Sequence, residues 1–210
     1  MNTLNVLRFD RYRDLTGDIV PEAYFRCAAI RELIFPWPPR TMERQFTEVR
    51  SGWTDKFLYV HLWAKDSWIT ARERKPKGRV FEDDCLEVFL MPETGRYFGW
   101  EVNALGTLLE YRVEGWGSGA VEEKNFDYKW KSFASWKARR HDAGWVLEMK
   151  IPFSKDLGMV PRRGDSWRAT FNRIDVDRQG RQSLSTFSDI AAEAPVWFHS
   201  PSTFGQIVFG

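Results

Sequence analysis

The stretch Phe81-Glu82-Asp83-Asp84-Cys85-Leu86-Glu87-Val88-Phe89-Leu90 decides the fold, because its apolar residues recur with a period of two. This alternation puts Leu86, Val88 and Leu90 on one face of a strand and Glu87 on the other. We therefore predict a strand that carries a carboxylate on its second face.

A second alternating run, residues 97–103, follows closely and predicts a partner strand. The linker Pro92–Arg96 has the proline and glycine of a turn, so the two runs are expected to form a hairpin. With Met91 placed opposite Tyr97, the register of the whole ladder is fixed.

This register sets Glu87 opposite Glu101, and Cys85 opposite Asn103. Two carboxylates facing each other on a sheet repel, so we expect a cation or a ligand rich in hydroxyl groups beside them. The candidate cations are Arg72 and Arg74, from a basic loop over residues 67–79, and Arg173, from a later strand.

Length and composition predict one domain over residues 1–210, with residues 1–40 as an irregular wrapping segment that contains a short strand near 24–29. The 31 basic and 29 acidic residues are interspersed, which argues against nucleic acid and an anionic membrane as partners. No apolar run approaches the ~20 residues of a membrane span. The first ten residues lack the pattern of a secretory leader, so we expect a cytoplasmic protein.

Short alternating runs separated by glycine and proline turns continue along the chain, and helical periodicity is nearly absent. This pattern predicts an all-β fold, an antiparallel β-sandwich of jelly-roll or immunoglobulin-like type. Besides the hairpin, the expected strands are 45–50, 57–64, 107–113, 129–139, 145–151, 166–174 and 205–209.

Five segments, in this order, resemble carbohydrate-binding module family 9 and its DOMON-related β-sandwich relatives. They are the opening stretch at 81–90, then Tyr97-Phe98-Gly99-Trp100-Glu101-Val102-Asn103-Ala104-Leu105-Gly106-Thr107, Trp145-Val146-Leu147-Glu148-Met149-Lys150-Ile151-Pro152-Phe153, Trp167-Arg168-Ala169-Thr170-Phe171-Asn172-Arg173 and Phe198-His199-Ser200-Pro201-Ser202-Thr203-Phe204-Gly205-Gln206-Ile207-Val208-Phe209. The resemblance covers roughly residues 57–210.

The resemblance implies a sugar held between two aromatic side chains, which fall here on Phe81 and Phe187. Glu87 and Asn103 match the family's polar contacts, whereas Glu101 occupies a position where some members carry arginine. The implied function is non-catalytic binding of a small saccharide, or of an oligosaccharide end, in an aromatic-lined cleft at the sheet edge. Phenylalanine in place of the usual tryptophan implies weaker stacking.

Three alternatives remain open at this stage. Glu87 and Glu101 are a possible carboxylate pair of a glycoside-acting enzyme, which needs a separation of ~5–9.5 Å. A haem protein needs axial ligands, for which the chain offers only three histidines, His61, His141 and His199, besides its five methionines. A degenerate site would leave a protein-interaction module.

No cofactor is predicted, although calcium occurs in parts of the family and the chain offers oxygen donors at Asp83, Asp84, Asp175 and Asp177. Its two cysteines, Cys27 and Cys85, have the spacing of neither a disulfide framework nor a zinc site.

Overall fold

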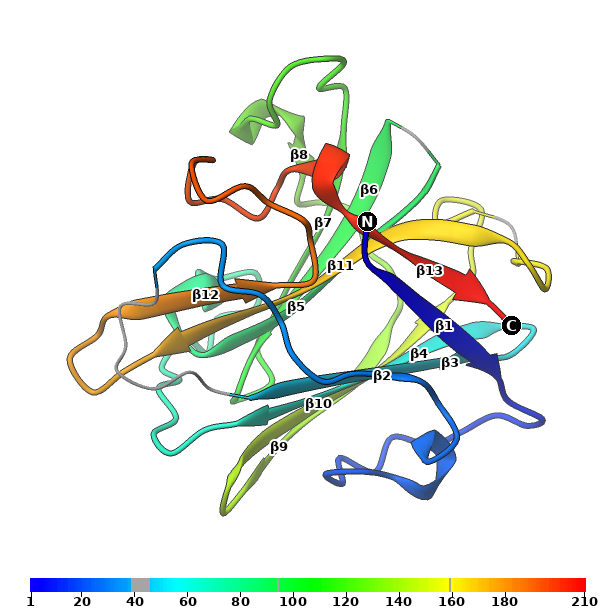
Figure 1. Ribbon diagram of the computed structural model, residues 1–210, viewed down its shortest axis with the longest axis horizontal. Coiled ribbons are helices and arrows are strands. Elements are labelled where there is room, and N and C mark those ends of the chain that lie inside the picture. Colours follow the sequence, from blue (N-terminus) through cyan, green and yellow to red (C-terminus); the bar gives the residue numbers. More distant parts are fainter. Residues whose placement is uncertain (39–45, 94, 159) are drawn as a thin grey trace.

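One curled β-sheet forms the body of the protein (Figure 1). The computed structural model describes residues 1–38, 46–93, 95–158 and 160–210. In these residues the strand order is β8-β7-β6-β5-β11-β13-β1-β3-β4-β10-β9, with β12 beside β11 and β2 beside β3. The strands are β1 Thr3–Arg8, β2 Ala29–Ile30, β3 Thr47–Trp53, β4 Phe57–Lys65, β5 Cys85–Glu93, β6 Arg96–Asn103, β7 Leu108–Glu114, β8 Phe126–Asp127, β9 Ser135–His141, β10 Gly144–Pro152, β11 Ser166–Val176, β12 Gln182–Thr186 and β13 Gly205–Phe209. Short 3-10 helices are η1 Glu22–Tyr24, η2 Val80–Glu82, η3 Glu123–Asn125 and η4 Pro201–Thr203.

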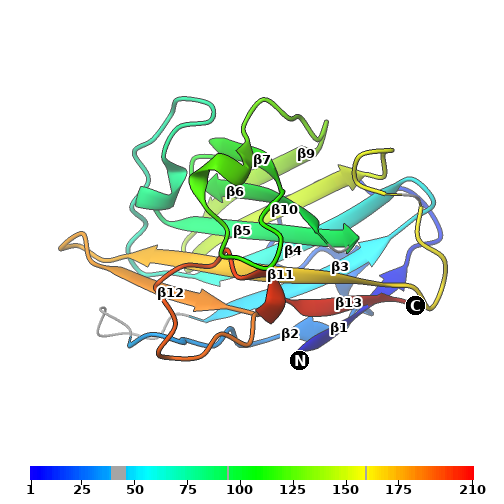
Figure 2. The same cartoon turned by 90° about the horizontal axis from the view of Figure 1, so that it is seen from above.

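The curl brings two halves of this sheet face to face, as Figure 2 shows from above. Leu86 and Val88 of β5 belong to the same buried cluster as Val60 and Leu62 of β4. Trp100 of β6 is fully buried in that cluster. The predicted inward face of β5 is therefore confirmed, and its apolar side chains form the main core between the halves.

The sheet is mixed rather than antiparallel throughout, because β1 runs parallel to both of its neighbours, β13 and β3. Its Leu4 and Val6 are buried in the core. This segment was predicted to be irregular, and that prediction was wrong. In residues 22–30 the structure has η1 and the two-residue β2 instead of a strand near 24–29. Gln45, the first residue of another predicted strand, lies outside the described residues.

The β5–β6 hairpin has the predicted register over most of its length. Cys85 lies opposite Asn103, and Glu87 lies opposite Glu101. The ladder shifts between Leu90 and Glu93, so the predicted pairing at the start of the turn is replaced by a bulge. Thr94 of the turn lies outside the described residues.

Most of the other predicted strands are present, although their bounds differ by up to six residues, as for β9, which begins at Ser135 instead of 129, and β12 was not predicted. Among the described residues, no helix has the length and apolar character needed to cross a membrane.

Candidate functional site

Glu87 and Glu101 face each other on the outer side of the β5 half of the sheet, and both are buried, with 2% and 4% exposure. Tyr111 donates a 2.6 Å hydrogen bond to Glu101 Oε1, and the Asn172 amide donates one of 3.1 Å to Glu87 Oε2. Glu101 Oε2 is buried without a hydrogen-bond partner among the described residues. The predicted pairing of carboxylates is therefore present, but in the interior rather than on an open face.

Burial raises the pKa of both carboxyl groups. Burial raises the pKa of Glu101 to about 7, although the hydrogen bond from Tyr111 has the opposite effect and lowers this pKa. For Glu87 burial is again the main cause, and the neighbouring Glu101 raises its pKa further. The repulsion is relieved by keeping a proton on the pair, which a buried site favours at neutral pH.

The predicted arginines do not neutralise this pair. Arg173 binds Asp66 at 3.2 Å and Asp175 at 2.5 Å, in a separate buried network. The only hydrogen bond of Arg72 in the described chain is its backbone amide to Asp83. Arg74 lies in a surface pocket described below. In the described part of the chain, neither glutamate forms a salt bridge with an arginine or lysine, and a cation beside them stays a prediction.

A second apolar cluster seals the outer face over these glutamates. Phe89 of β5 stacks on His199 at 4.8 Å between ring centroids, and the Tyr97 hydroxyl lies 2.7 Å from His199 Nδ1. Burial lowers the pKa of His199 to about 3, so its ring is neutral. Phe204, from the segment before β13, is fully buried in the same cluster. His199 thus has a packing role.

The two aromatic residues of the predicted clamp lie in different layers. Phe187 is 5% exposed and packs against Phe171 in the main core between the halves. Phe81, on η2, packs at the edge of the outer cluster, with the Arg79 guanidinium 5.4 Å from its ring centre. In this structure they do not face each other across a cleft.

Asn103 holds two loops together rather than presenting its amide to solvent. Its Nδ2 donates to the Glu73 carbonyl at 2.9 Å and to Asp83 Oδ2 at 2.8 Å. Its Oδ1 accepts the backbone amides of Leu105 and Thr107, at 3.1 and 3.0 Å. All of its polar capacity is used, and it fixes the β6–β7 turn against the basic loop that precedes η2.

These two loops form the walls of an open pocket of about 440 Å³. The edge strand β9 contributes Trp136 to this pocket, and the indole N–H donates a 2.9 Å hydrogen bond to the Gly106 carbonyl. Trp136 is 37% exposed, so a fixed aromatic surface is accessible to solvent. The pocket is lined by Arg74, Pro76, Lys77, Leu105, Gly106, Thr107, Leu108, Glu110, Lys131 and Trp136.

The backbone near this pocket is strained at two places. Among the described non-glycine residues, only Lys77 (φ 61°) and Phe133 (φ 56°) have positive φ. Lys77 is held by its backbone amide, which donates to the Leu108 carbonyl at 2.9 Å. Its ammonium group donates to the carbonyls of Tyr128 and, at 3.4 Å, Trp130. Such conformations persist where surrounding contacts enforce them, and they cluster at functional sites.

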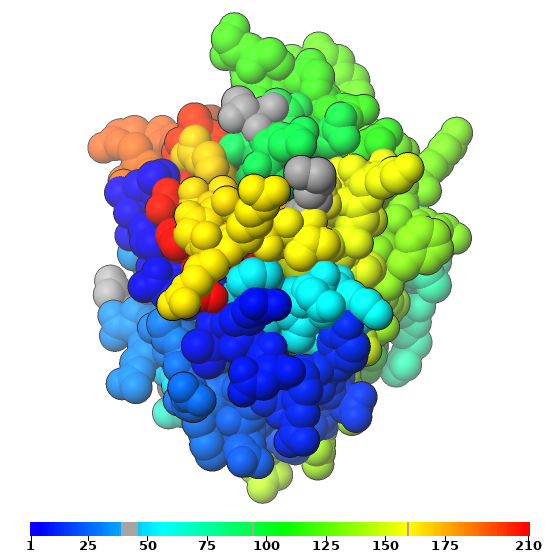
Figure 3. Space-filling view, turned by 90° about the vertical axis from the view of Figure 1, so that its right-hand side faces the viewer, coloured from blue at the N-terminus to red at the C-terminus, as the bar shows by residue number. Residues whose placement is uncertain are grey.

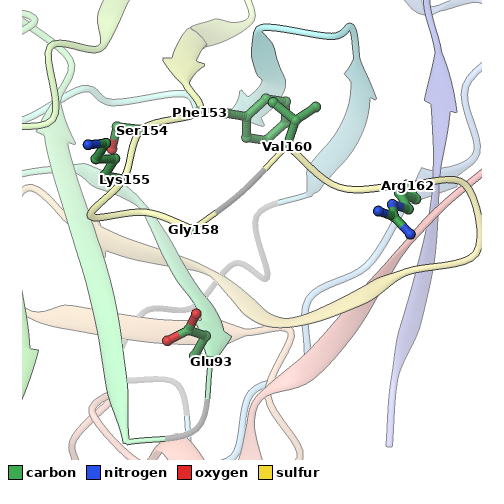
Figure 4. A pocket seen from close by; sticks show the side chains of 7 residues that line it. All are labelled: Glu93, Phe153, Ser154, Lys155, Gly158, Val160 and Arg162. Carbon is green, nitrogen blue, oxygen red and sulfur yellow. The ribbon is translucent and has the colours of Figure 1, made fainter.

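A second pocket, of about 590 Å³, lies between β5 and the segment after β10. Figure 4 shows its labelled side chains spread around the opening, from Lys155 to Arg162. Figure 3 shows the segment after β10 in yellow on the surface, next to blue atoms of the N-terminal part and red atoms of the C-terminal part of the chain. Its one aromatic residue, Phe153, packs edge-on against Trp167 at 5.6 Å. It offers no exposed tryptophan, so the Trp136 pocket is the better candidate for binding a ring.

The aspartates predicted as calcium donors are occupied by protein groups. Asp83 accepts backbone amides from the basic loop, and Asp84 accepts the Val176 amide at 2.7 Å. Asp175 pairs with Arg173, and Asp177 with Arg181 at 2.7 Å. Two groups among the described residues, Asp66 with Asp84 and Asp175, and Cys85 with Glu87 and Glu101, each have potential ligand atoms within 4.8 Å of one another. Both cysteines are free and buried.

Sequence reasoning identified Arg74 but missed Trp136. The residue lies within a run that was predicted only as a strand, 129–139. No local signal marks it as exposed, because the polar neighbours Ser135 and Lys137 point to the opposite face of a strand, and the position of β9 at the sheet edge is not visible in the sequence.

A sequence profile of Carbohydrate-binding family 9 matches residues 29–209. Among solved structures, a carbohydrate binding module family 9 from Caldicellulosiruptor kristjanssonii in complex with glucose is 17% identical, with a TM-score of 0.68 and coverage of 99% of this chain and 95% of that chain. A structure of a carbohydrate binding module family 9 from the same organism in complex with cellotriose is 17% identical, with a TM-score of 0.67 and coverage of 99% of this chain and 93% of that chain. A carbohydrate-binding candidate from Bacteroides uniformis ATCC 8492 is 22% identical, with a TM-score of 0.77 and coverage of 100% and 99%.

At these identities the structural likeness concerns the fold alone. No curated protein sequence matches this chain. The profile match, however, spans most of its length. The chain therefore belongs to carbohydrate-binding family 9.

Proposed function

We propose that the protein binds a small saccharide, or the end of an oligosaccharide, without cleaving it, and that the sugar occupies the Trp136 pocket. The observation that carries this proposal is a solvent-accessible indole fixed at the rim of a polar pocket. Pyranose rings have C–H faces that pack on aromatic planes, and a rigid indole offers a large area at low entropic cost. Family membership supports the saccharide class, as do structural neighbours in complex with glucose and cellotriose.

The polar groups of the pocket suit hydroxyl recognition. Glu110 Oε2 accepts two hydrogen bonds from Ser132, at 3.0 Å from its amide and 2.6 Å from its hydroxyl. Within the described residues, Glu110 Oε1 has no hydrogen-bond partner. A fixed carboxylate with a free acceptor atom can orient a sugar hydroxyl beside the indole.

Cleavage is not part of the proposal, because the predicted carboxylate pair is buried. Glycoside hydrolysis needs two carboxyl groups on either side of a bound glycosidic bond. Glu87 and Glu101 lie beneath the outer aromatic cluster, with at most 4% exposure, and a sugar chain cannot lie between them there.

The finer fold class is part of the same proposal. The two facing halves of the curled sheet, with the main core between them, support a β-sandwich of jelly-roll or immunoglobulin-like type. The parallel pairings of β1 make it a mixed rather than an antiparallel version.

Titration calorimetry against a panel of mono- and oligosaccharides tests the function. A saccharide that binds the wild type should lose at least about tenfold in affinity with Trp136→Ala, which corresponds to the ~1.5–3 kcal/mol of a buried large side chain. Trp68→Ala is the matched control, because Trp68 is also exposed, at 48%, but lies outside this pocket. Equal losses in both variants, or no ligand in a broad panel, would refute the proposal.

A further inference from the structure

The charges around the Trp136 pocket are unbalanced. Its lining includes three cations, Arg74, Lys77 and Lys131, and one carboxylate, that of Glu110. Lys77 is engaged by two backbone carbonyls, and Glu110 by Ser132. Arg74 and Lys131 remain as cations without such partners. This excess of positive charge is local to the pocket, because the whole chain has a net charge of only +2.

Arg74 and Lys131 are both exposed, and their side chains have no hydrogen-bond or ion-pair partner in the part of the chain that the structure describes. Glu73, the nearest acidic residue in sequence, forms no ion pair with Arg74 in the described residues, and its Oε1 accepts the Lys75 amide at 2.7 Å. A guanidinium can bind a carboxylate through two parallel N–H donors, and an ammonium group adds a second point of charge.

We infer that the Trp136 pocket selects an anionic saccharide, one whose ring carries a carboxylate as in a uronic acid. The ring stacks on Trp136 while Arg74 and Lys131 bind the carboxylate. This inference rests on the proposed function and adds the substrate class. The pocket volume of about 440 Å³ fits a few sugar units at most, whereas nucleic acids and anionic membranes are bound by extended surfaces.

The preference for an anionic saccharide can be tested with two ligands that have the same sugar rings and differ in charge, trigalacturonate and its methyl ester. A second pair is methyl β-glucuronide and methyl β-glucoside. Calorimetry at low ionic strength should give the acid at least about tenfold tighter binding than its neutral counterpart, the effect of one charge-assisted hydrogen-bonded pair. Raising the salt concentration should reduce this preference.

The double variant Arg74→Gln with Lys131→Gln should bring the preference for the acid close to onefold while neutral binding persists. Lys75→Gln is the matched control, because Lys75 is exposed in the same loop and does not line the pocket. A wild type that binds the neutral ligand as tightly as the acid, with both sensitive to Trp136→Ala, would overturn the charge inference alone. If neither member of any pair binds, the proposed function itself fails.

Discussion

The Tyr111 hydroxyl lies 2.6 Å from Glu101 Oε1 and donates to it, on the same buried face where Glu101 lies opposite Glu87. This hydrogen bond replaces the cation that two facing carboxylates would otherwise need. The tyrosine hydroxyl is neutral and does not compensate a second negative charge. Burial therefore favours a state in which at most one of the two glutamates is ionised and the other is protonated. The outer face of the hairpin is therefore a structural element whose stability depends on pH.

Glu101→Gln is predicted to raise the free energy of unfolding at pH 8 and to have little effect near pH 5. Burial raises the pKa of Glu101 from its ordinary value of 4.5 to about 7. The folded state thus holds a proton that the unfolded chain releases, so this group's contribution is fully present below pH 4.5 and is lost as pH rises through 7. The gain at pH 8 should be about 1–3 kcal/mol.

Urea unfolding between pH 5 and 8 checks this prediction, read as the difference between variant and wild type. The wild type must be subtracted because His199 also makes stability depend on pH. Its pKa is lowered from the ordinary 6.5 to about 3, so the folded state loses stability as the pH falls below 6.5. Glu32→Gln, at an exposed glutamate, is the control. A difference that stays constant across this pH range would contradict the assignment.

Arg173→Met is predicted to lower the free energy of unfolding by about 3–5 kcal/mol, because it leaves Asp66 and Asp175 buried without their cation. Arg173 is 1% exposed and also donates to the Lys65 carbonyl at 2.9 Å. Arg181→Met removes an exposed pair with Asp177 and should cost ~1 kcal/mol or less. Similar losses in the two variants, measured by urea unfolding, would show that the buried network is not a main source of stability.

Asn103→Ala is predicted to loosen both walls of the Trp136 pocket. The substitution removes the acceptor for the Leu105 and Thr107 amides and the donor to the basic loop. Hydrogen exchange of these two amides should accelerate, the free energy of unfolding should fall by about 1–3 kcal/mol, and saccharide affinity should fall with it. Unchanged exchange rates at these positions would mean that Asn103 does not hold the turn.

The sequence predicted what is local and periodic. The β5–β6 hairpin, including the facing pair Glu87 and Glu101, follows from alternation and a short linker, which together fix the register. Strand β1 has only six residues and is placed by parallel pairing with β13 at the other end of the chain, so no local pattern identifies it.

The candidate site was predicted less well, because its surroundings come from distant loops. A cation or a hydroxyl-rich ligand was expected beside the glutamates on the outer face of the hairpin, but Phe204 and His199, from the segment before β13, cover this face. Asn103 was expected to contact a ligand, and it instead binds two loops whose meeting creates the pocket. Trp136 was missed because its exposure depends on β9 being the edge strand, which is a property of the whole sheet.

The central claim is that a saccharide binds on the Trp136 indole, and a titration followed by the tryptophan indole N–H signals in a ¹H–¹⁵N correlation spectrum tests it most directly. Each of the 11 tryptophans gives one such signal, and Trp136→Phe identifies that of Trp136. With trigalacturonate or cellotriose as the ligand, the Trp136 signal should shift in a saturable manner while that of Trp68 stays in place. A saturable shift confined to Trp116 or Trp197, with the Trp136 signal unmoved, would contradict the account and move the site to the outer face over Glu87.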